Sequence, residues 1–110
     1  MHESLTVLIE RNFELTTDFV TEPYETAWAR EARWFLVLDN EPDPQWSVRL
    51  ETDISPEGLN WCPLEDAEST VVDRRVTSWR VREFGGWLRL RGTVSGQGYA
   101  KGSLYLALKA

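Results

Sequence analysis

Residues 77–94 read TSWRVREFGGWLRLRGTV, and this stretch decides the expected fold. Apolar side chains alternate with arginines on both sides of Gly85-Gly86, which is the period-two pattern of strands with one apolar and one charged face. A glycine pair between two such runs favours a two-residue turn, so we predict a β-hairpin. Its register would place Phe84 opposite Trp87, Arg82 opposite Arg89, and Arg80 opposite Arg91.

This register places like charges directly across from each other, which destabilises a sheet by up to about 1 kcal/mol per pair. Three arrangements would offset the repulsion: outward carboxylates such as Glu51 on a neighbouring strand, an acidic patch on a second subunit, or a bound anion. We therefore predict that the outward side of the hairpin is an interface or ligand face. Its residues are Arg80, Arg82, Phe84, Trp87, Arg89 and Arg91.

The composition predicts one β domain spanning residues 1–110. The chain has 110 residues, a mass of 12.7 kDa and six tryptophans, enough large apolar side chains for one core without disulfides. The single cysteine, Cys62, has no partner within the chain, which favours a reducing compartment. No signal peptide or membrane-spanning run is visible, so we expect a cytoplasmic or particle-associated protein that makes no membrane contact. The net charge of -6 argues against a nucleic-acid partner.

Further strands are expected over residues 5–10, 13–20, 34–38, 46–52 and 103–109. Residues 34–38 are continuously apolar, which is typical of a central strand. Trp46, Val48 and Leu50 should point inward, as should Leu104, Leu106 and Leu108. We expect the strands at 34–38 and 46–52 to be neighbours, joined by the loop 39–44. Residues 23–32 fit a short helix or a strand equally well.

Ser55-Pro56-Glu57-Gly58 is typical of a tight turn, because proline suits its second position and glycine tolerates a left-handed backbone. Many short strands separated by turns, without recurring helices, predict an all-β fold. The expected architecture is an antiparallel two-sheet sandwich of jelly-roll type.

The run from Trp46 to Leu64, centred on Ser55-Pro56-Glu57-Gly58-Leu59-Asn60-Trp61, resembles small bacterial and phage β-sandwich modules. In those modules a strand leads into Ser-Pro-Asp-Gly, two further residues and a tryptophan, and here Glu57 stands in place of the aspartate. Residues 87–94, the glycine-rich loop and the alternating last strand are similar to the matching end of these modules. The nearest resemblance is to an uncharacterised family of small proteins from spore-forming bacteria. It implies a binding or assembly module without enzymatic activity.

Catalytic chemistry has little support in the residues. The only histidine, His2, lies next to the terminus, and Cys62 has no adjacent base, so we interpret Cys62 as buried or half-buried filler. Two acidic groups could offer oxygen ligands to Ca²⁺, Asp39 with Glu41 and Asp43, and Glu65 with Asp66 and Glu68, but neither matches a known calcium loop. We predict no catalytic residues, no cofactor and no metal.

Two functions fit the pattern. The leading hypothesis is a structural or interaction module that forms homo-oligomers through the arginine and aromatic face. The alternative is a carbohydrate-binding module in which Trp87, with Tyr105 or Trp61, forms a stacking platform for a glycan. Trp34, Trp46 and Trp79 fall at inward positions and are interpreted as core.

Overall fold

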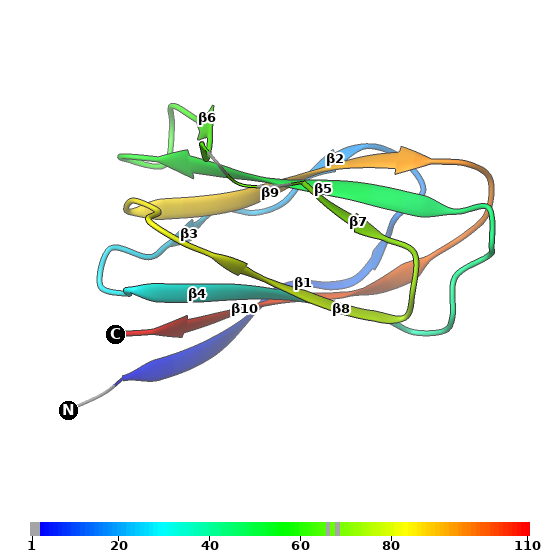
Figure 1. The fold of residues 1–110 in the computed structure, drawn as a ribbon, viewed down its shortest axis with the longest axis horizontal. Helices are drawn as coiled ribbons and strands as arrows, with labels where there is room; N and C mark the ends of the chain where they lie inside the picture. Colours follow the sequence, from blue (N-terminus) through cyan, green and yellow to red (C-terminus); the bar gives the residue numbers. More distant parts are fainter. Residues whose placement is uncertain (1–2, 66, 68) are drawn as a thin grey trace.

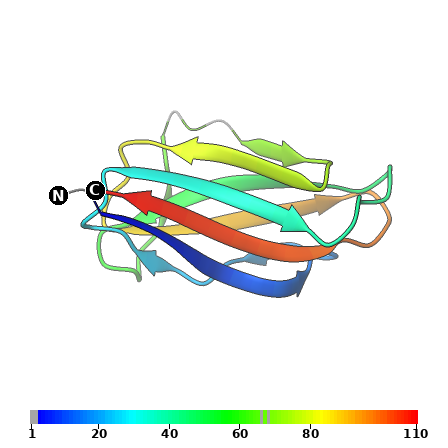
Figure 2. The ribbon, with the colours of Figure 1, turned by 90° about the horizontal axis from the view of Figure 1, so that it is seen from below.

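The strands of the computed structural model, which describes residues 3–65, 67 and 69–110, form two antiparallel sheets packed face to face (Figure 1). Sheet A contains, in spatial order, β1 (Ser4–Glu14), β10 (Lys101–Lys109), β4 (Glu31–Leu38) and β8 (Val76–Val81), which lie side by side in Figure 2. Sheet B has β9 (Trp87–Ser95) and β5 (Ser47–Ser55) at its centre. Short strands complete sheet B: β2 (Phe19–Val20) and β3 (Tyr24–Glu25) pair with β9, and β6 (Cys62–Pro63) and β7 (Thr70–Val72) pair with β5.

The chain alternates between the sheets, which is the jelly-roll arrangement. From β1 in sheet A it passes to β2 and β3 in sheet B, returns to β4, passes to β5, β6 and β7, and returns again to β8. It then crosses to β9 and ends at β10. The predicted all-β sandwich is therefore confirmed. Residues 3–65, 67 and 69–110 contain no helix, hence none with the length and apolar character needed to cross a membrane.

The core lies between the two sheets and follows the predicted alternation. On β5 and just before it, Trp46, Val48 and Leu50 are at most 2% exposed. On β10 the three leucines 104, 106 and 108 are buried in the same way. In β4 the inward residues include Trp34, which is fully buried, and β4 is a central strand of sheet A. Strand periodicity thus identified the inward side chains correctly.

The predicted hairpin at residues 77–94 is wrong. β8 pairs with β4 in sheet A, and β9 pairs with β5 in sheet B, so Gly85-Gly86 lies in a crossover between the sheets. A type I′ turn needs positive φ at both central residues. Neither glycine has one, whereas Glu83 bends the chain with a φ of 50° at the exit from β8. This pairing also avoids both like-charge pairs of the predicted register.

Two other predicted connections are also wrong, and a segment left open is now defined. Residues 13–20 are not one strand, because β1 ends at Glu14 and the chain crosses to sheet B before β2. The strands at 34–38 and 46–52 are not neighbours, because β4 and β5 belong to different sheets and the loop 39–44 joins the two sheets. Residues 23–32, left open from the sequence, form the two-residue strand β3, a turn and the start of β4.

The Ser55–Gly58 turn is confirmed, and its side chains hold it. The Ser55 hydroxyl accepts a hydrogen bond of 2.8 Å from the Gly58 amide, and Gly58 has a φ of +86°. The Glu57 carboxylate accepts hydrogen bonds from the amides of Leu59 and Asn60 at 3.2 and 2.7 Å. These bonds, that of Asn60 above all, lower the pKa of Glu57 below its ordinary value of 4.5.

Candidate functional site

The structure divides the predicted arginine and aromatic face between two surfaces. Arg80 belongs to β8 in sheet A, and Arg82 follows that strand. Arg89, Arg91 and Trp87 belong to β9 and lie on the outer face of sheet B, because the alternate β9 residues are buried. The prediction that Phe84 points outward beside Trp87 is wrong, since Phe84 is half-buried and packs against the core.

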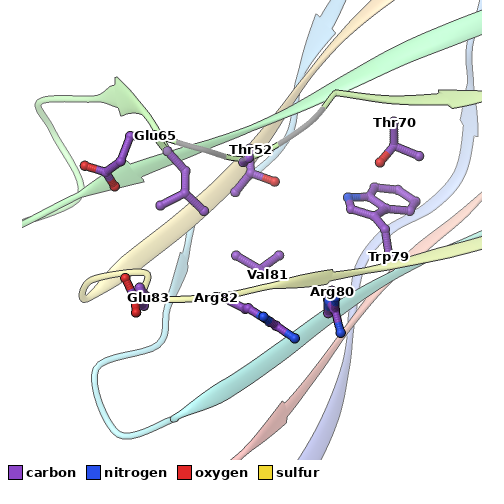
Figure 3. Close-up of a pocket in the computed structure, with 10 residues that line it drawn as sticks. Thr52, Glu65, Thr70, Trp79, Arg80, Val81, Arg82 and Glu83 are labelled. Atoms are coloured by element: carbon purple, nitrogen blue, oxygen red, sulfur yellow. The ribbon is translucent and has the colours of Figure 1, made fainter.

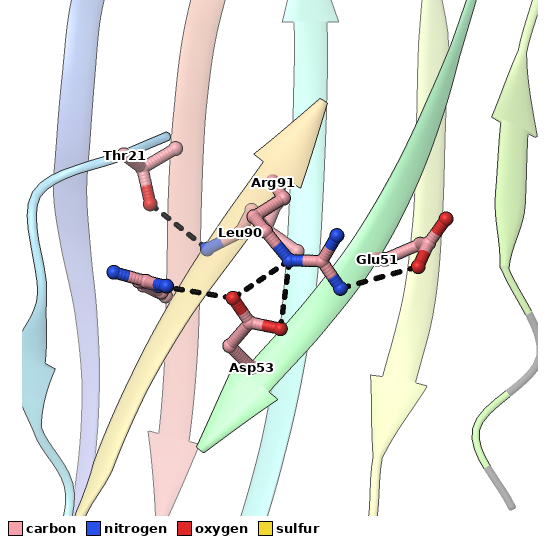
Figure 4. A network of polar contacts seen from close by, with 6 residues as sticks. Thr21, Glu51, Asp53, Leu90 and Arg91 are labelled. Carbon is pink, nitrogen blue, oxygen red and sulfur yellow. Dashed lines mark hydrogen bonds and ion pairs between the residues drawn. The ribbon is translucent and has the colours of Figure 1, made fainter. Parts of the chain in front are cut away.

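On the outer face of sheet B, carboxylates of the neighbouring strand neutralise both arginines (Figure 4). The register places Asp53 opposite Arg89 and Glu51 opposite Arg91. Arg89 Nε lies 3.0 Å from Asp53 Oδ2, and Arg91 Nε lies 2.9 and 2.8 Å from the two oxygens of the same carboxylate. Arg91 Nη2 reaches Glu51 Oε2 at 3.2 Å.

Asp53 is the centre of this network. Its side chain is only 3% exposed, whereas those of Arg89 and Arg91 are 24% and 37% exposed. The hydrogen bond to Asp53 is the main reason why the pKa of Arg91 is raised. The expected role of Glu51 as an offsetting carboxylate is confirmed for Arg91. Asp53 was missed, although its place in the alternation Arg49, Glu51, Asp53 marks it as outward.

The predicted stacking residues are also separated. Trp61 and Trp87 belong to the sheet B side, whereas Tyr105 alternates with buried leucines of β10 and lies on the outer face of sheet A. Trp87 and Tyr105 therefore form no common platform. The Arg89 guanidinium lies 4.4 Å from the centre of the Trp61 ring, and a side-chain carbon added to Gly58 would come within 3.1 Å of the Trp87 indole. Arg89 therefore covers one face of the Trp61 indole, and Gly58 lies next to the Trp87 indole.

The outer face of sheet A presents a different arrangement, which we call the sheet A face. The cross-strand register aligns Leu8, Tyr105, Phe35 and Ser78 in one row across all four strands. In the next row Arg33 lies directly opposite Arg80. Leu8 is 41% exposed and Val76, on the same face, is 44% exposed. The face thus combines an apolar row with a like-charge pair.

Arg33 and Arg80 form no ion pair with any residue in the described part of the chain. Arg33 Nη1 donates a hydrogen bond of 2.9 Å to the neutral Ser78 hydroxyl. The repulsion that the sequence predicted between arginines is therefore present, but between β4 and β8. Arg33 was missed because its partner strand was not known, although it alternates with the inward residues Ala32 and Trp34.

A cavity of about 610 Å³ opens between β8 and sheet B (Figure 3). Trp79 and Val81 point into it from β8 and face Thr52 of β5 and Thr70 of β7. Leu64, Glu65 and Glu83 complete its apolar and acidic walls. Arg80 and Arg82 also line the cavity, with side chains that extend to the other side of β8 (Figure 3). This cavity could not be predicted from the sequence, because three separate segments form it. Trp79, interpreted as core, is half-buried at its wall.

The residues considered for catalysis and metal binding are not gathered into a site. Cys62 is exposed on β6, so its interpretation as buried filler is wrong; residue 62 belongs to a two-residue edge strand. His2, Asp66 and Glu68 lie outside the described residues. In the part of the chain that the structure describes, no three His, Cys, Asp or Glu side chains are grouped closely enough to hold a metal ion.

Comparisons with known proteins show that this chain shares its fold with several solved structures. No protein-family model matches the sequence, and a search of curated proteins gives no significant match. Among solved structures, the chain is similar to the PBSX exported protein XepA, with a TM-score of 0.67 and 12% identity over 94% of this chain. The aligned part is only 36% of the XepA chain.

The SPBc2 prophage-derived protein YomS has a TM-score of 0.60 and 8% identity, and the alignment covers 100% of this chain and 96% of YomS. A looser likeness, with a TM-score of 0.46 and 12% identity, links 99% of the chain to 85% of a protein from Bacillus endospore appendages. The sandwich architecture thus occurs in a prophage-derived protein, as the resemblance implied. The Ser-Pro-Glu-Gly motif as the mark of a family stays a prediction.

Proposed function

We propose that this protein is a non-enzymatic structural or interaction module that self-associates through the sheet A face. The observation that carries the proposal is the apolar row Leu8, Tyr105 and Phe35 beside the pair Arg33 and Arg80. Arginine and aromatic side chains are enriched at the centres of protein interfaces. Arg89 and Arg91 are neutralised by carboxylates of the same chain. We therefore propose the contact surface on the outer face of sheet A and not on the outer face of sheet B.

A second copy of this chain is the partner that the charges favour. The chain carries 18 acidic and 12 basic residues, so its surface as a whole is acidic and complements a pair of exposed arginines. Glu31 lies two residues from Arg33 on the same side of β4. The sheet A face therefore carries both signs of charge and can complement itself across a twofold axis.

The likeness to XepA and to the prophage-derived protein YomS supports the proposal at the level of fold. A two-sheet sandwich with an exposed face that carries apolar side chains and arginines fits a structural or interaction role. The whole of XepA is longer than this chain, so only its matching part is comparable.

Light scattering tests the proposal. We expect an oligomer at about 50 mM salt that weakens at about 500 mM, because salt screens the arginine contacts. Val76→Asp should weaken association at least about tenfold, since it places a charge beside the apolar row. Val71→Asp is the matched control: Val71 is 53% exposed on an edge strand of sheet B, opposite Arg49. A monomer at every salt concentration, or equal effects of both substitutions, would refute the proposal.

Arg80→Glu separates association from folding. Within one chain it replaces a like-charge pair with an opposite-charge pair, so the thermal stability of the monomer should rise slightly. In the assembly it removes a contact, so association should weaken. Weaker association together with an unchanged or higher melting temperature supports the sheet A face. Unchanged association excludes Arg80 from the interface.

A further inference from the structure

The cavity beside β8 exists because the sandwich is incomplete on that flank. β8 is the edge strand of sheet A, and the strands facing it across the interior, β6 and β7, have only two and three residues. The inward side chains of β8 are therefore not fully covered. Trp79 stays half-buried, whereas its cross-strand neighbour Trp34 on β4 is fully buried.

The cavity has the size and lining of a small-molecule site. Its volume of about 610 Å³ lies within the range of roughly 300–1,000 Å³ usual for ligand pockets. The indole of Trp79 lies beside Thr70, and Thr52 faces Val81 (Figure 3). No hydrogen bond from the hydroxyl of Thr52 or Thr70 to another described residue is found, so both can serve a ligand. The walls thus offer one aromatic face and two hydroxyl groups.

The acidic end of the cavity disfavours an anion. Glu65 and Glu83 line the end of the cavity where β8 finishes. Arg80 and Arg82 also belong to the lining, but their side chains extend to the other side of β8 (Figure 3). Ionised carboxylates only accept hydrogen bonds, and two oxygens of one carboxylate can accept from two adjacent hydroxyl groups. A neutral ligand rich in hydroxyl groups suits this end, whereas an anionic one would be repelled.

Two buried polar atoms lie behind the Trp79 wall. Trp34 Nε1 and Thr77 Oγ1 have no hydrogen-bond partner among the residues that the structure describes. Trp34 is opposite Trp79 in the register, and Thr77 precedes it on the same face of β8. Buried polar groups are normally hydrogen-bonded, so hydrogen bonding is incomplete behind Trp79, although Trp34 and Thr77 are not part of the cavity lining.

We propose that this cavity is a binding site for a neutral saccharide, with one sugar ring stacked on the indole of Trp79. The apolar face of a pyranose covers the indole, the hydroxyls of Thr52 and Thr70 hydrogen bond to it, and Glu65 or Glu83 accepts from adjacent ring hydroxyls. The proposal moves glycan binding from the outer-face residues Trp61, Trp87 and Tyr105 to the interior flank. It is independent of self-association through the sheet A face.

NMR of the indole N–H groups tests the site directly. Trp→Phe variants assign the six indole signals, and the full chain is titrated with cellopentaose, xylopentaose, maltopentaose and mannopentaose. The Trp79 signal should move with at least one of these sugars at or below about 10 mM, within the weak range of carbohydrate affinities. Signals of Trp61 and Trp87 should stay in place. Tri-galacturonic acid, an anionic sugar, should bind at least about tenfold more weakly.

Two substitutions test whether Trp79 and Thr70 contact the sugar. Trp79→Ala should abolish the binding, and Thr70→Val, which keeps the side-chain volume, should weaken it about three- to tenfold through loss of one hydrogen bond. Trp61→Ala is the control and should leave affinity unchanged. Thr70→Val keeps the test valid if Trp79→Ala fails to fold.

Several results would overturn the proposal. These are no movement of the Trp79 signal with any of the four sugars, movement of Trp61 or Trp87 instead, or preference for the anionic sugar. If raising the protein concentration without sugar shifts only the backbone amide signals of residues 76–81, β8 pairs with a strand of a second copy. That result would mean strand pairing at the β8 edge and not sugar binding. Light scattering of the same samples reports the oligomeric state separately, so failure of either proposal is recognised by itself.

Discussion

Replacing Asp53 by asparagine should cost far more stability than the same change at Glu51, although both carboxylates bind Arg91. Asp53 is 3% exposed and accepts charge-assisted hydrogen bonds from Arg89 and Arg91, whereas Glu51 is 41% exposed and contacts Arg91 only. Removing one partner of a fully buried ion pair costs about 3–5 kcal/mol. Both arginines are partly hydrated here, so we expect a loss of about 2–4 kcal/mol in the free energy of unfolding.

Glu51→Gln is the matched comparison, since a surface ion pair contributes at most about 1 kcal/mol. Urea unfolding measures both effects: with a slope of about 2 kcal/mol per molar urea, Asp53→Asn should lower the midpoint by about 1–2 M and Glu51→Gln by about 0.5 M or less. If the urea midpoints of the two variants differ by less than about 0.3 M, the burial of Asp53 does not determine how much the ion-pair network contributes to stability. The reasoning from exposure would then be refuted.

Two further predictions concern turns. The Glu57 carboxylate has a lowered pKa because it accepts the Asn60 amide, so its contribution to stability is present above pH 4.5 and lost as the pH falls through its folded pKa. The difference in melting temperature between the parent and Glu57→Gln should therefore shrink below pH 4.5, and a constant difference would contradict this role. Gly96→Ala should destabilise by about 2 kcal/mol or more, because its φ is +80° and the added carbon would lie 1.7 Å from the Gln45 carbonyl oxygen. Gly85→Ala, with its nearest non-neighbouring atom 3.9 Å away and no positive φ, should be near neutral in the same thermal unfolding assay.

The sequence predicted which side chains point inward far better than which strands pair. Alternation depends only on the geometry of one strand, so Trp46, Val48 and Leu50 could be placed in the core without knowledge of their neighbours. The Ser55–Gly58 turn was predictable for the same reason, because its bonds lie within four residues. Pairing depends on contacts across the whole chain. Residues 77–94 have the same alternation in a hairpin and in a crossover between sheets.

The candidate sites depend on such distant contacts. The Asp53 network joins β5 to β9, and the cavity joins β5, β7 and β8, so neither is present within one segment of sequence. The half-buried state of Trp79 follows from the edge position of β8, which alternation does not reveal. The outward position of Tyr105 was predicted correctly, but its sheet was not known, and it was therefore joined to Trp87 across the thickness of the molecule.

The arginines show how pairing and function are connected. A hairpin would have set Arg82 against Arg89 and Arg80 against Arg91, whereas the crossover gives Arg89 and Arg91 the carboxylates of β5. The fold thereby removes the repulsion on β9 but leaves Arg80 opposite Arg33 on β4. Since opposed like charges cost stability, the pair on sheet A has no folding advantage within one chain. An acidic contact from a second copy would offset this cost, which is why we propose the interface on the sheet A face and not on the arginine-rich face of β9.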